Sequence, residues 1–306
     1  MPDGTSREAL GQAGPPSASL PPMDAQPTSP SRAALWMSGW LSLMLVIAIA
    51  GREALRGLHV FQVMELRSLI GFAMVWPLVH ASGGWRAMGT ARPGQHVLRN
   101  VVHFGAQYCW FAALLMIPLA QVVAIEFTMP IWSAVLAVAL LGERMDRGKW
   151  VAIALGLAGV VAIVRPSATT IEPGQLVALA SAFGFAASVV LVKSLTRTDA
   201  AIKISVWMLV VQSVIGLLPA LHVWAWPTPA AWGWVAVVAF CGVYSHYCFA
   251  RAMQHAPATV LVPMDFLRVP LTALAGWAIY GERVDAMTVV GVLLILAGNL
   301  LNLRRR

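Results

Sequence analysis

The chain has 306 residues, of which 59% are apolar and only 11% are charged. A soluble domain carries about 25% charged residues, so charge is too sparse here to cover a surface that faces water. The formal net charge is +8, but the basic residues are dispersed between apolar runs, which argues against nucleic acid as a partner. The composition predicts an integral membrane protein.

Residues 1–33 differ from the rest of the chain. They are rich in Pro, Ser, Gly and Ala and contain no apolar run, so we expect a disordered tail. A secretory signal is not expected, because no basic region leads directly into an apolar one. Residues 304–306 form a short basic C-terminal tail.

Ten apolar segments follow the first tail. A spanning helix needs about 20 mostly apolar residues, and the gaps between the segments leave no room for a separate soluble domain. The sequence therefore predicts an all-α integral membrane protein with ten transmembrane helices. The expected helices lie near residues 34–51, 60–80, 98–117, 119–141, 148–165, 174–194, 204–223, 230–252, 257–280 and 285–303.

The loops predict the orientation, because cytoplasmic loops carry the excess of Lys and Arg. With the N-terminus in the cytoplasm, fifteen of the 21 basic residues fall on the cytoplasmic side. Four fall on the far side, and two, Arg67 and Arg268, lie within helices. We expect both termini in the cytoplasm and, with no signal sequence, a bacterial inner membrane as the location.

The chain repeats itself with an offset of 139 residues. Tyr108-Cys109 matches Tyr247-Cys248, and the register holds without a gap to Leu157-Ala158-Gly159 and Leu296-Ala297-Gly298. Each repeat holds five helices, an odd number, so the second is inverted relative to the first. The predicted architecture is two inverted five-helix repeats, residues 34–166 and 173–303, which is a recurrent plan of secondary transporters.

Both copies resemble a known family. Pro118 through Gly142-Glu143-Arg144 to Pro166 resembles the EamA domain of the drug/metabolite transporter superfamily, and the pattern recurs from Pro257 to Gly298. The resemblance implies a ten-helix inverted-repeat carrier for small organic metabolites, many members being exporters. The second copy departs slightly, since Pro270 is one residue out of register with Pro130.

Charged residues within the predicted spans are the first candidates for the solute site, because a charge in a bilayer is costly without a partner. Glu126 and Asp265 are one repeat apart, so the inverted pair should face a shared centre and bind a cationic group, a proton, or both. A structural ion pair is the alternative, since Arg268 can reach Asp265 on the same helix face. Arg67 could hold a substrate carboxylate or pair with either acid, and Glu65, two residues away, points elsewhere.

Polar and aromatic side chains on the third and eighth helices complete the candidate set. They suit a solute cavity, and they also suit hydrogen bonds between helices. The substrate- or proton-binding candidates are Glu126, Asp265, Arg268, Arg67, Glu65, His103, Gln107, Tyr108, His246 and Tyr247.

Other classes of site find little support. The three cysteines lie in apolar runs without metal-site spacing, and the sequence contains neither a G-x-x-x-x-G-K-[ST] phosphate loop nor an H-E-x-x-H motif. We expect no cofactor, no metal and no catalytic residue. A membrane enzyme or a channel that uses the same carboxylates remains an alternative to a carrier.

The expected partners are the lipid bilayer and a small solute. The residue types suit a zwitterion or organic cation, such as an amino acid, a nucleoside-like metabolite or an adenosylated amino acid. Coupling to protons or exchange, with export, is the expected mode. Ala180, Gly184 and Ser188 form a small-xxx-small stripe, which favours internal packing or a homodimer.

Overall fold

A computed structural model describes residues 29–141, 147–164, 172–253, 255–256, 261 and 264–304. All regular secondary structure in these ranges is helical. Predictions on residues 1–28, on Gly142-Glu143-Arg144 and on residues 305–306 fall outside them. The helices are α1 (Pro30–Ala54), α2 (Val60–Ala81), the 3-10 helix η2 (Trp85–Met88), α3 (Pro93–Met116), α4 (Leu119–Glu126), α5 (Met129–Leu141), α6 (Arg147–Val164), α7 (Pro173–Leu195), α8 (Ala201–His222), α9 (Pro229–Met253), α11 (Arg268–Tyr280) and α12 (Ala286–Arg304).

Within the described residues, six segments are long and apolar enough to cross a membrane: α1, α2, Leu119–Leu136, α7, α8 and α9. The apolar stretches of α6 and α12 are shorter. α3 has a spanning length but carries His96, Arg99, Asn100 and Gln107 among its buried residues, which lowers its hydropathy. The all-helical membrane fold is thus confirmed, while hydropathy alone supports fewer spans than ten.

Proline places several helix starts. Pro30, Pro93 and Pro173 occupy the first turns of α1, α3 and α7, where a missing N–H costs no hydrogen bond and a fixed φ favours the helix. α1 consequently begins a few residues before the predicted start at residue 34.

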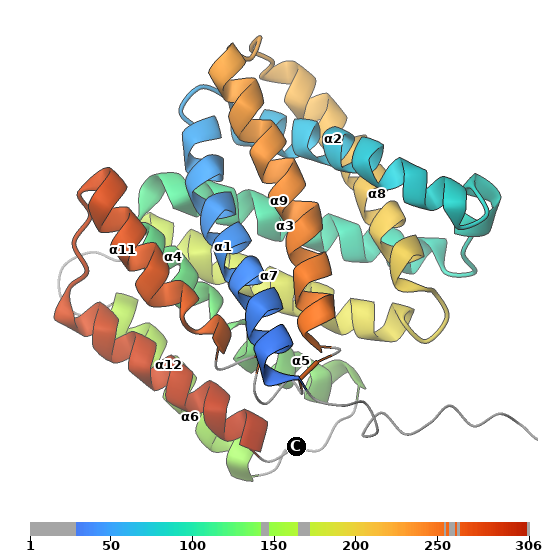
Figure 1. Cartoon of the computed structure of the whole chain (residues 1–306). Coiled ribbons are helices and arrows are strands. Elements are labelled where there is room, and N and C mark those ends of the chain that lie inside the picture. Colours follow the sequence, from blue (N-terminus) through green and yellow to red (C-terminus); the bar gives the residue numbers. More distant parts are fainter. Residues whose placement is uncertain are drawn as a thin grey trace, which may run out of the picture.

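The helices pack in antiparallel and crossed pairs (Figure 1). α1 lies along α9, α3 along α7, and α2 along α8. α6 and α12 lie side by side at the lower edge of the molecule in Figure 1. Their backbones come close at Gly159 and Gly291, where a methyl group added to Gly159 would lie 2.6 Å from the Gly291 carbonyl oxygen.

The predicted stripe on α7 serves internal packing. A methyl group added to Gly184 would lie 2.9 Å from the Ala106 Cβ on α3. The Ser188 hydroxyl lies 3.2 Å from His103 Nδ1, which is also on α3. The part of the stripe formed by Gly184 and Ser188 therefore faces α3.

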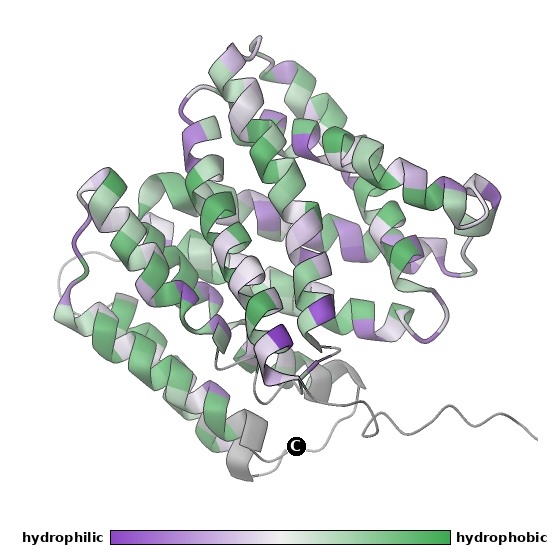
Figure 2. Ribbon diagram, viewed as in Figure 1, coloured by the Kyte–Doolittle hydropathy of each residue, from purple (hydrophilic) through white to green (hydrophobic). Residues whose placement is uncertain are grey.

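Hydrophobic residues make up most of the helices, and many hydrophilic residues lie at helix ends and connections (Figure 2). On α8, Val214, Leu218 and Leu221 are 70%, 77% and 56% exposed at helical spacing. A stripe of this kind suits contact with lipid and would be a liability in water.

The fourth predicted span, 119–141, is interrupted. α4 ends at Glu126, Phe127 and Thr128 form a turn, and α5 begins at Met129. Asn299 on α12 donates to the Phe127 carbonyl at 2.9 Å and so satisfies a backbone acceptor that the break leaves free. A second turn, at Phe266 and Leu267, precedes α11 one repeat further along.

Candidate functional site

Two carboxylates and one arginine meet where α4 and α11 cross. Arg268 Nη1 lies 2.9 Å from Glu126 Oε1, and its Nη2 lies 3.5 Å from Asp265 Oδ2. Only 6% of the Arg268 side chain is exposed, against 15% and 17% for the two acids. The predicted contact between Asp265 and Arg268 is therefore present, and Glu126 joins it from the other half of the chain.

Each acid also accepts an indole N–H. Trp110 Nε1 donates to Glu126 Oε2 at 2.9 Å, and Trp40 Nε1 donates to Asp265 Oδ1 at 2.7 Å. Sequence reasoning missed Trp40, because a tryptophan in an apolar run is equally compatible with a side chain that faces lipid and with one that faces a polar site. Two acids around one cation leave one formal negative charge, so this cluster suits a further proton or a cationic group.

The helix breaks position this cluster. Glu126 is the last residue of α4, and Asp265 directly precedes the turn before α11. The Phe127 and Phe266 rings meet edge to face at 5.2 Å. The Arg268 guanidinium lies 4.8 Å from the Phe127 ring centroid. The two turns thus bring equivalent residues of both repeats into one contact, and a cation on an aromatic face gains additional stabilisation.

Arg67 lies in a second polar cluster, whose described hydrogen-bond partners are two glutamines. Its Nη2 lies 3.4 Å from Gln107 Oε1 on α3 and 3.4 Å from Gln212 Oε1 on α8. With the Gln107 amide turned, its oxygen accepts from both Arg67 Nη atoms at 2.7 and 3.0 Å, and its nitrogen donates to Gln212 at 3.0 Å. The predicted alternative, a pair between Arg67 and Glu126 or Asp265, is absent from the described ion pairs. Gln212 had a signal in the sequence, since it is an amide within an apolar run.

Glu65 forms no described hydrogen bond with this cluster, although it too lies against α8. Its side chain is buried, and a methyl group on Gly216 of α8 would lie 2.7 Å from its Oε2. Within the described residues neither carboxylate oxygen has a hydrogen-bond partner. Intramembrane acids without a partner mark proton or substrate pathways.

The remaining candidates divide between the interior and the outer surface. His103 contacts Ser188, and Tyr108 stacks on Phe61 with ring centroids 4.7 Å apart. His246 lies 6.1 Å from Trp40, the residue that holds Asp265. Tyr247 is 48% exposed and contacts Trp36, so it does not join either polar cluster.

The Gly-Glu motif of the second repeat has a structural role that sequence reasoning missed. Gly281 adopts a left-handed conformation, φ +67°, and ends α11. The chain then turns back, so that Glu282 Oε2 accepts from the Leu119 N–H at the start of α4 at 2.9 Å. Glu282 also forms an ion pair with Arg52 on α1. One carboxylate therefore caps the helix that carries Glu126 and ties it to α1.

A polar cluster at the other end of the bundle joins the α2–α3 and α7–α8 connections. Asp199 lies 2.8 Å from Thr90, 3.1 Å from His96 and 3.3 Å from Lys203. Burial raises the pKa of the Asp199 carboxyl group, but hydrogen bonds with these three residues outweigh burial and hold that pKa below its usual range. Sequence reasoning did not single out any of these residues as a cluster.

Comparison with known proteins places these features in a family. The model of the EamA-like transporter family matches twice, at residues 32–165 and 172–304. A solved structure aligns with a TM-score of 0.62 at 20% identity and covers 90% of this chain and 99% of its own, which shows a shared fold.

Three curated relatives are named as transporters. A riboflavin transporter of Rhizobium johnstonii is 31% identical over 76% of this chain and 78% of its own. An S-adenosylmethionine uptake transporter of Rickettsia prowazekii is 25% identical over 79% and 82%. The pseudopaline exporter CntI of Pseudomonas aeruginosa is 25% identical over 80% and 86%. With the family model matching both halves, the chain belongs to the EamA-like transporter family and is a membrane transporter, not an enzyme.

Proposed function

We propose that the protein is a secondary carrier that moves a small organic metabolite by alternating access. The observation that carries the proposal is the contact of Glu126 and Asp265, one repeat apart, through a single arginine at two aligned helix breaks. Secondary transporters place their solute sites at such breaks, on the interface of two repeats. An interface between two related halves can be exposed to one side of the membrane and then to the other.

The proposed architecture is ten spans in two inverted five-helix repeats. The packing supports it, because the contacts between helices are symmetric. If helices one to five are swapped with helices six to ten, the contact of helices one and eight becomes that of six and three, and the contacts two–seven and five–ten stay the same. Helix one lies on helix eight (α1 with α9), and helix three lies on helix six (α3 with α7). Helix two lies on helix seven (α2 with α8), and helix five on helix ten (α6 with α12). Such a pattern is expected of a pseudo-two-fold axis that passes between the two halves.

The proposed solute is amino-acid-like, zwitterionic or cationic. The cluster of Glu126, Asp265 and Arg268 has an excess of negative charge, which suits a cationic group. Among the described residues Arg67 has amide partners and no acidic one, which leaves it suited to a carboxylate. The relatives named for S-adenosylmethionine and pseudopaline support an organic metabolite, and they include both an uptake transporter and an exporter.

The proposed coupling is to protons or to exchange, with export as the direction. A cationic group and Arg268 compete for the same two carboxylates, so solute entry requires Arg268 to be displaced or a proton to be lost from the cluster. A carboxylate with no described hydrogen-bond partner, Glu65, is a second position where a proton could be held.

The test is flux in proteoliposomes, preceded by a thermal-unfolding screen of the purified protein against amino acids, S-adenosylmethionine, riboflavin and organic cations. A ligand that binds the folded state raises the unfolding midpoint. For any hit, Glu126→Gln should reduce pH-dependent flux at least about tenfold. A tenfold loss corresponds to about 1.4 kcal/mol, and the loss of one hydrogen-bonded charge costs at least about that much. The protein should stay folded and inserted.

Glu172→Gln is the matched control, because Glu172 is an exposed acid outside the two clusters. Its flux should equal that of the wild type. Normal pH-dependent flux in Glu126→Gln would contradict the role of the cluster, and flux that rises with solute concentration without saturating would indicate a channel.

A further inference from the structure

A hollow of about 320 Å³ lies between η2 and α8. It is partly open, and its lining includes Trp85, Arg86, Met88, Val206 and Trp207. It shares no lining residue with the polar clusters around Arg268 and Arg67. The hollow is therefore a separate feature of the bundle surface.

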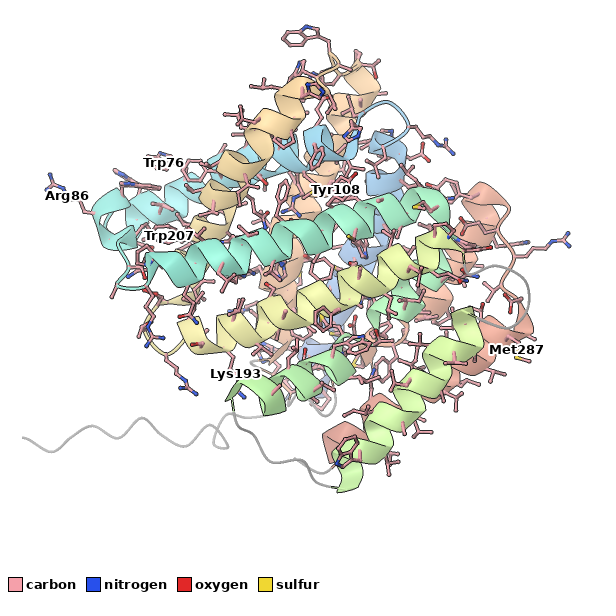
Figure 3. All side chains as sticks on the ribbon, turned by 180° about the vertical axis from the view of Figure 1, so that it is seen from behind. Trp76, Arg86, Tyr108, Lys193, Trp207 and Met287 are labelled. Atoms are coloured by element: carbon pink, nitrogen blue, oxygen red, sulfur yellow. The ribbon has the colours of Figure 1, made fainter. Side chains whose placement is uncertain are left out.

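The wall of the hollow is apolar apart from one guanidinium. Arg86 is exposed, and no described ion pair or hydrogen bond involves its side chain. Figure 3 shows Arg86, Trp76 and Trp207 at one end of the molecule, with Arg86 extending away from the ribbon. A cation above an apolar wall suits a ligand with an anionic group and a hydrocarbon part.

Aromatic rings continue from the hollow along the outside of α2. Trp85 and Trp76 are 53% and 45% exposed, and both contact the ring of Phe72, at 6.3 and 5.7 Å between centroids. Tryptophans gather where a membrane protein crosses from hydrocarbon to head groups. The rings therefore place the hollow at the depth of the lipid head groups.

The same end of the bundle is basic. Arg92 and Arg197 are exposed there, and Lys203 lies beside Asp199, whose carboxylate is already engaged by Thr90, His96 and that lysine. Basic residues close to a membrane surface attract anionic lipids. Charge and position thus both favour an anionic ligand from the bilayer.

The hollow is also held in shape. Trp207 Nε1 donates to the Met88 carbonyl at 3.0 Å and fixes η2 against α8. Met88 is buried in a small apolar cluster with Val75, Val79 and Val206. A preformed site loses less conformational entropy on binding.

We propose that this hollow binds an anionic phospholipid. Arg86 contacts the phosphate, the apolar wall receives the first part of an acyl chain, and the remainder of the lipid follows the exposed rings of α2. Because η2 connects α2 to α3, a bound lipid would stabilise this connection on α8. The proposal does not depend on the identity of the transported solute.

The test compares lipids on the purified full-length protein in detergent. Phosphatidylglycerol should raise the midpoint of thermal unfolding more than phosphatidylcholine does, since only a ligand of the folded state raises it. Arg86→Gln should weaken the apparent affinity for phosphatidylglycerol roughly fivefold, because one basic residue near an anionic surface contributes about 1 kcal/mol. Val210→Phe, which fills the hollow and leaves Arg86 in place, should weaken it as well.

Arg197→Gln is the matched control, because it removes the same charge from the same end but does not line the hollow. It should keep the response to phosphatidylglycerol. An equal loss in Arg197→Gln would show diffuse attraction and overturn the site. An equal response to soluble glycerol phosphate would show a site for a free anion and would overturn the proposal. The proposal would also be overturned if Arg86→Gln changed the affinity for the solute without changing the response to lipid, because the hollow would then belong to the transport path.

Discussion

Single residues in this protein act mainly by placing or compensating charge. Arg268 is almost fully buried, and its charge is compensated by two carboxylates, each of which also accepts an indole N–H. Removing one partner of a buried pair costs several kcal/mol, because the other charge stays desolvated. The residues that form the candidate site are therefore also residues that hold α4 on α11.

Asp199 offers a prediction of pH dependence outside the spans. The pKa of the Asp199 carboxyl group is held below its usual range in the folded protein. The ionised carboxylate therefore adds fully to the free energy of unfolding at any pH above the unfolded pKa of about 4. This contribution is lost as the pH falls from there through the lower pKa of the folded state. At pH 7, Asp199→Asn should destabilise the protein by about 1.5–3 kcal/mol, as expected when hydrogen bonds to a charged group are lost. The measurement is the midpoint of thermal unfolding in detergent from pH 7 down to about pH 3.

The difference between wild type and Asp199→Asn should shrink as the pH falls below about 4. Lys203 and Thr90 face Asp199 from α8 and from the connection before α3, and His96 faces it from α3 itself. Glu172→Gln, which removes an exposed acid, should show no comparable gap at any pH. A gap that stays constant down to pH 3 would mean that the Asp199 charge contributes nothing.

At the scale of the helix, the interrupted span shows what hydropathy does not report. Residues 119–141 form one apolar run, but Pro130 within it has no backbone N–H and crowds the preceding helical turn, which favours the break at Phe127 and Thr128. The freed Phe127 carbonyl depends on Asn299, which lies in another helix and donates to it. The start of α4 likewise depends on Glu282, a residue 163 positions away.

Gly276 tests the contact that caps α4. A methyl group added there would collide with the Glu282 carboxylate, so Gly276→Ala should displace that carboxylate from the Leu119 N–H and from Arg52. The loss of a helix cap costs about 0.5–2 kcal/mol, and we expect Gly276→Ala to lower the unfolding midpoint accordingly. Flux of the solute should fall with it, since the capped helix carries Glu126.

Gly233→Ala is the matched control on α9, because an added methyl group there meets no atom within 4 Å. Alanine in a helix is favoured over glycine by about 0.5–1 kcal/mol, so this variant should be unchanged or slightly more stable. If Gly276→Ala behaved like Gly233→Ala, the cap would have no energetic role.

At the scale of the whole molecule, the sequence predicted what depends on composition and internal repetition. Apolar runs located the helices, and the 139-residue offset identified Glu126 and Asp265 as partners before any contact was known. It predicted Gln107 as a site candidate, but it did not predict the contact of Trp40 with Asp265, the contacts of Arg67 with Gln107 and Gln212, or the cap on α4. Those contacts depend on which helices become neighbours, and no local pattern in the chain specifies that.

The orientation in the membrane is the property that the charge of the loops predicts and the packing leaves open. Arg197 in the α7–α8 connection and Lys203 in the first turn of α8 lie near Asp199, whereas Trp224 and Trp226 mark the connection between α8 and α9. Basic loops stay in the cytoplasm, so a reporter fused after Asp199 should read cytoplasmic and one fused after Pro227 should read external. Because α8 alone separates the two fusion points, the same readout from both would show that α8 does not span. Reversed readouts would place the termini outside and the hollow beside Arg86 on the outer leaflet, where the excess of anionic lipid is not expected.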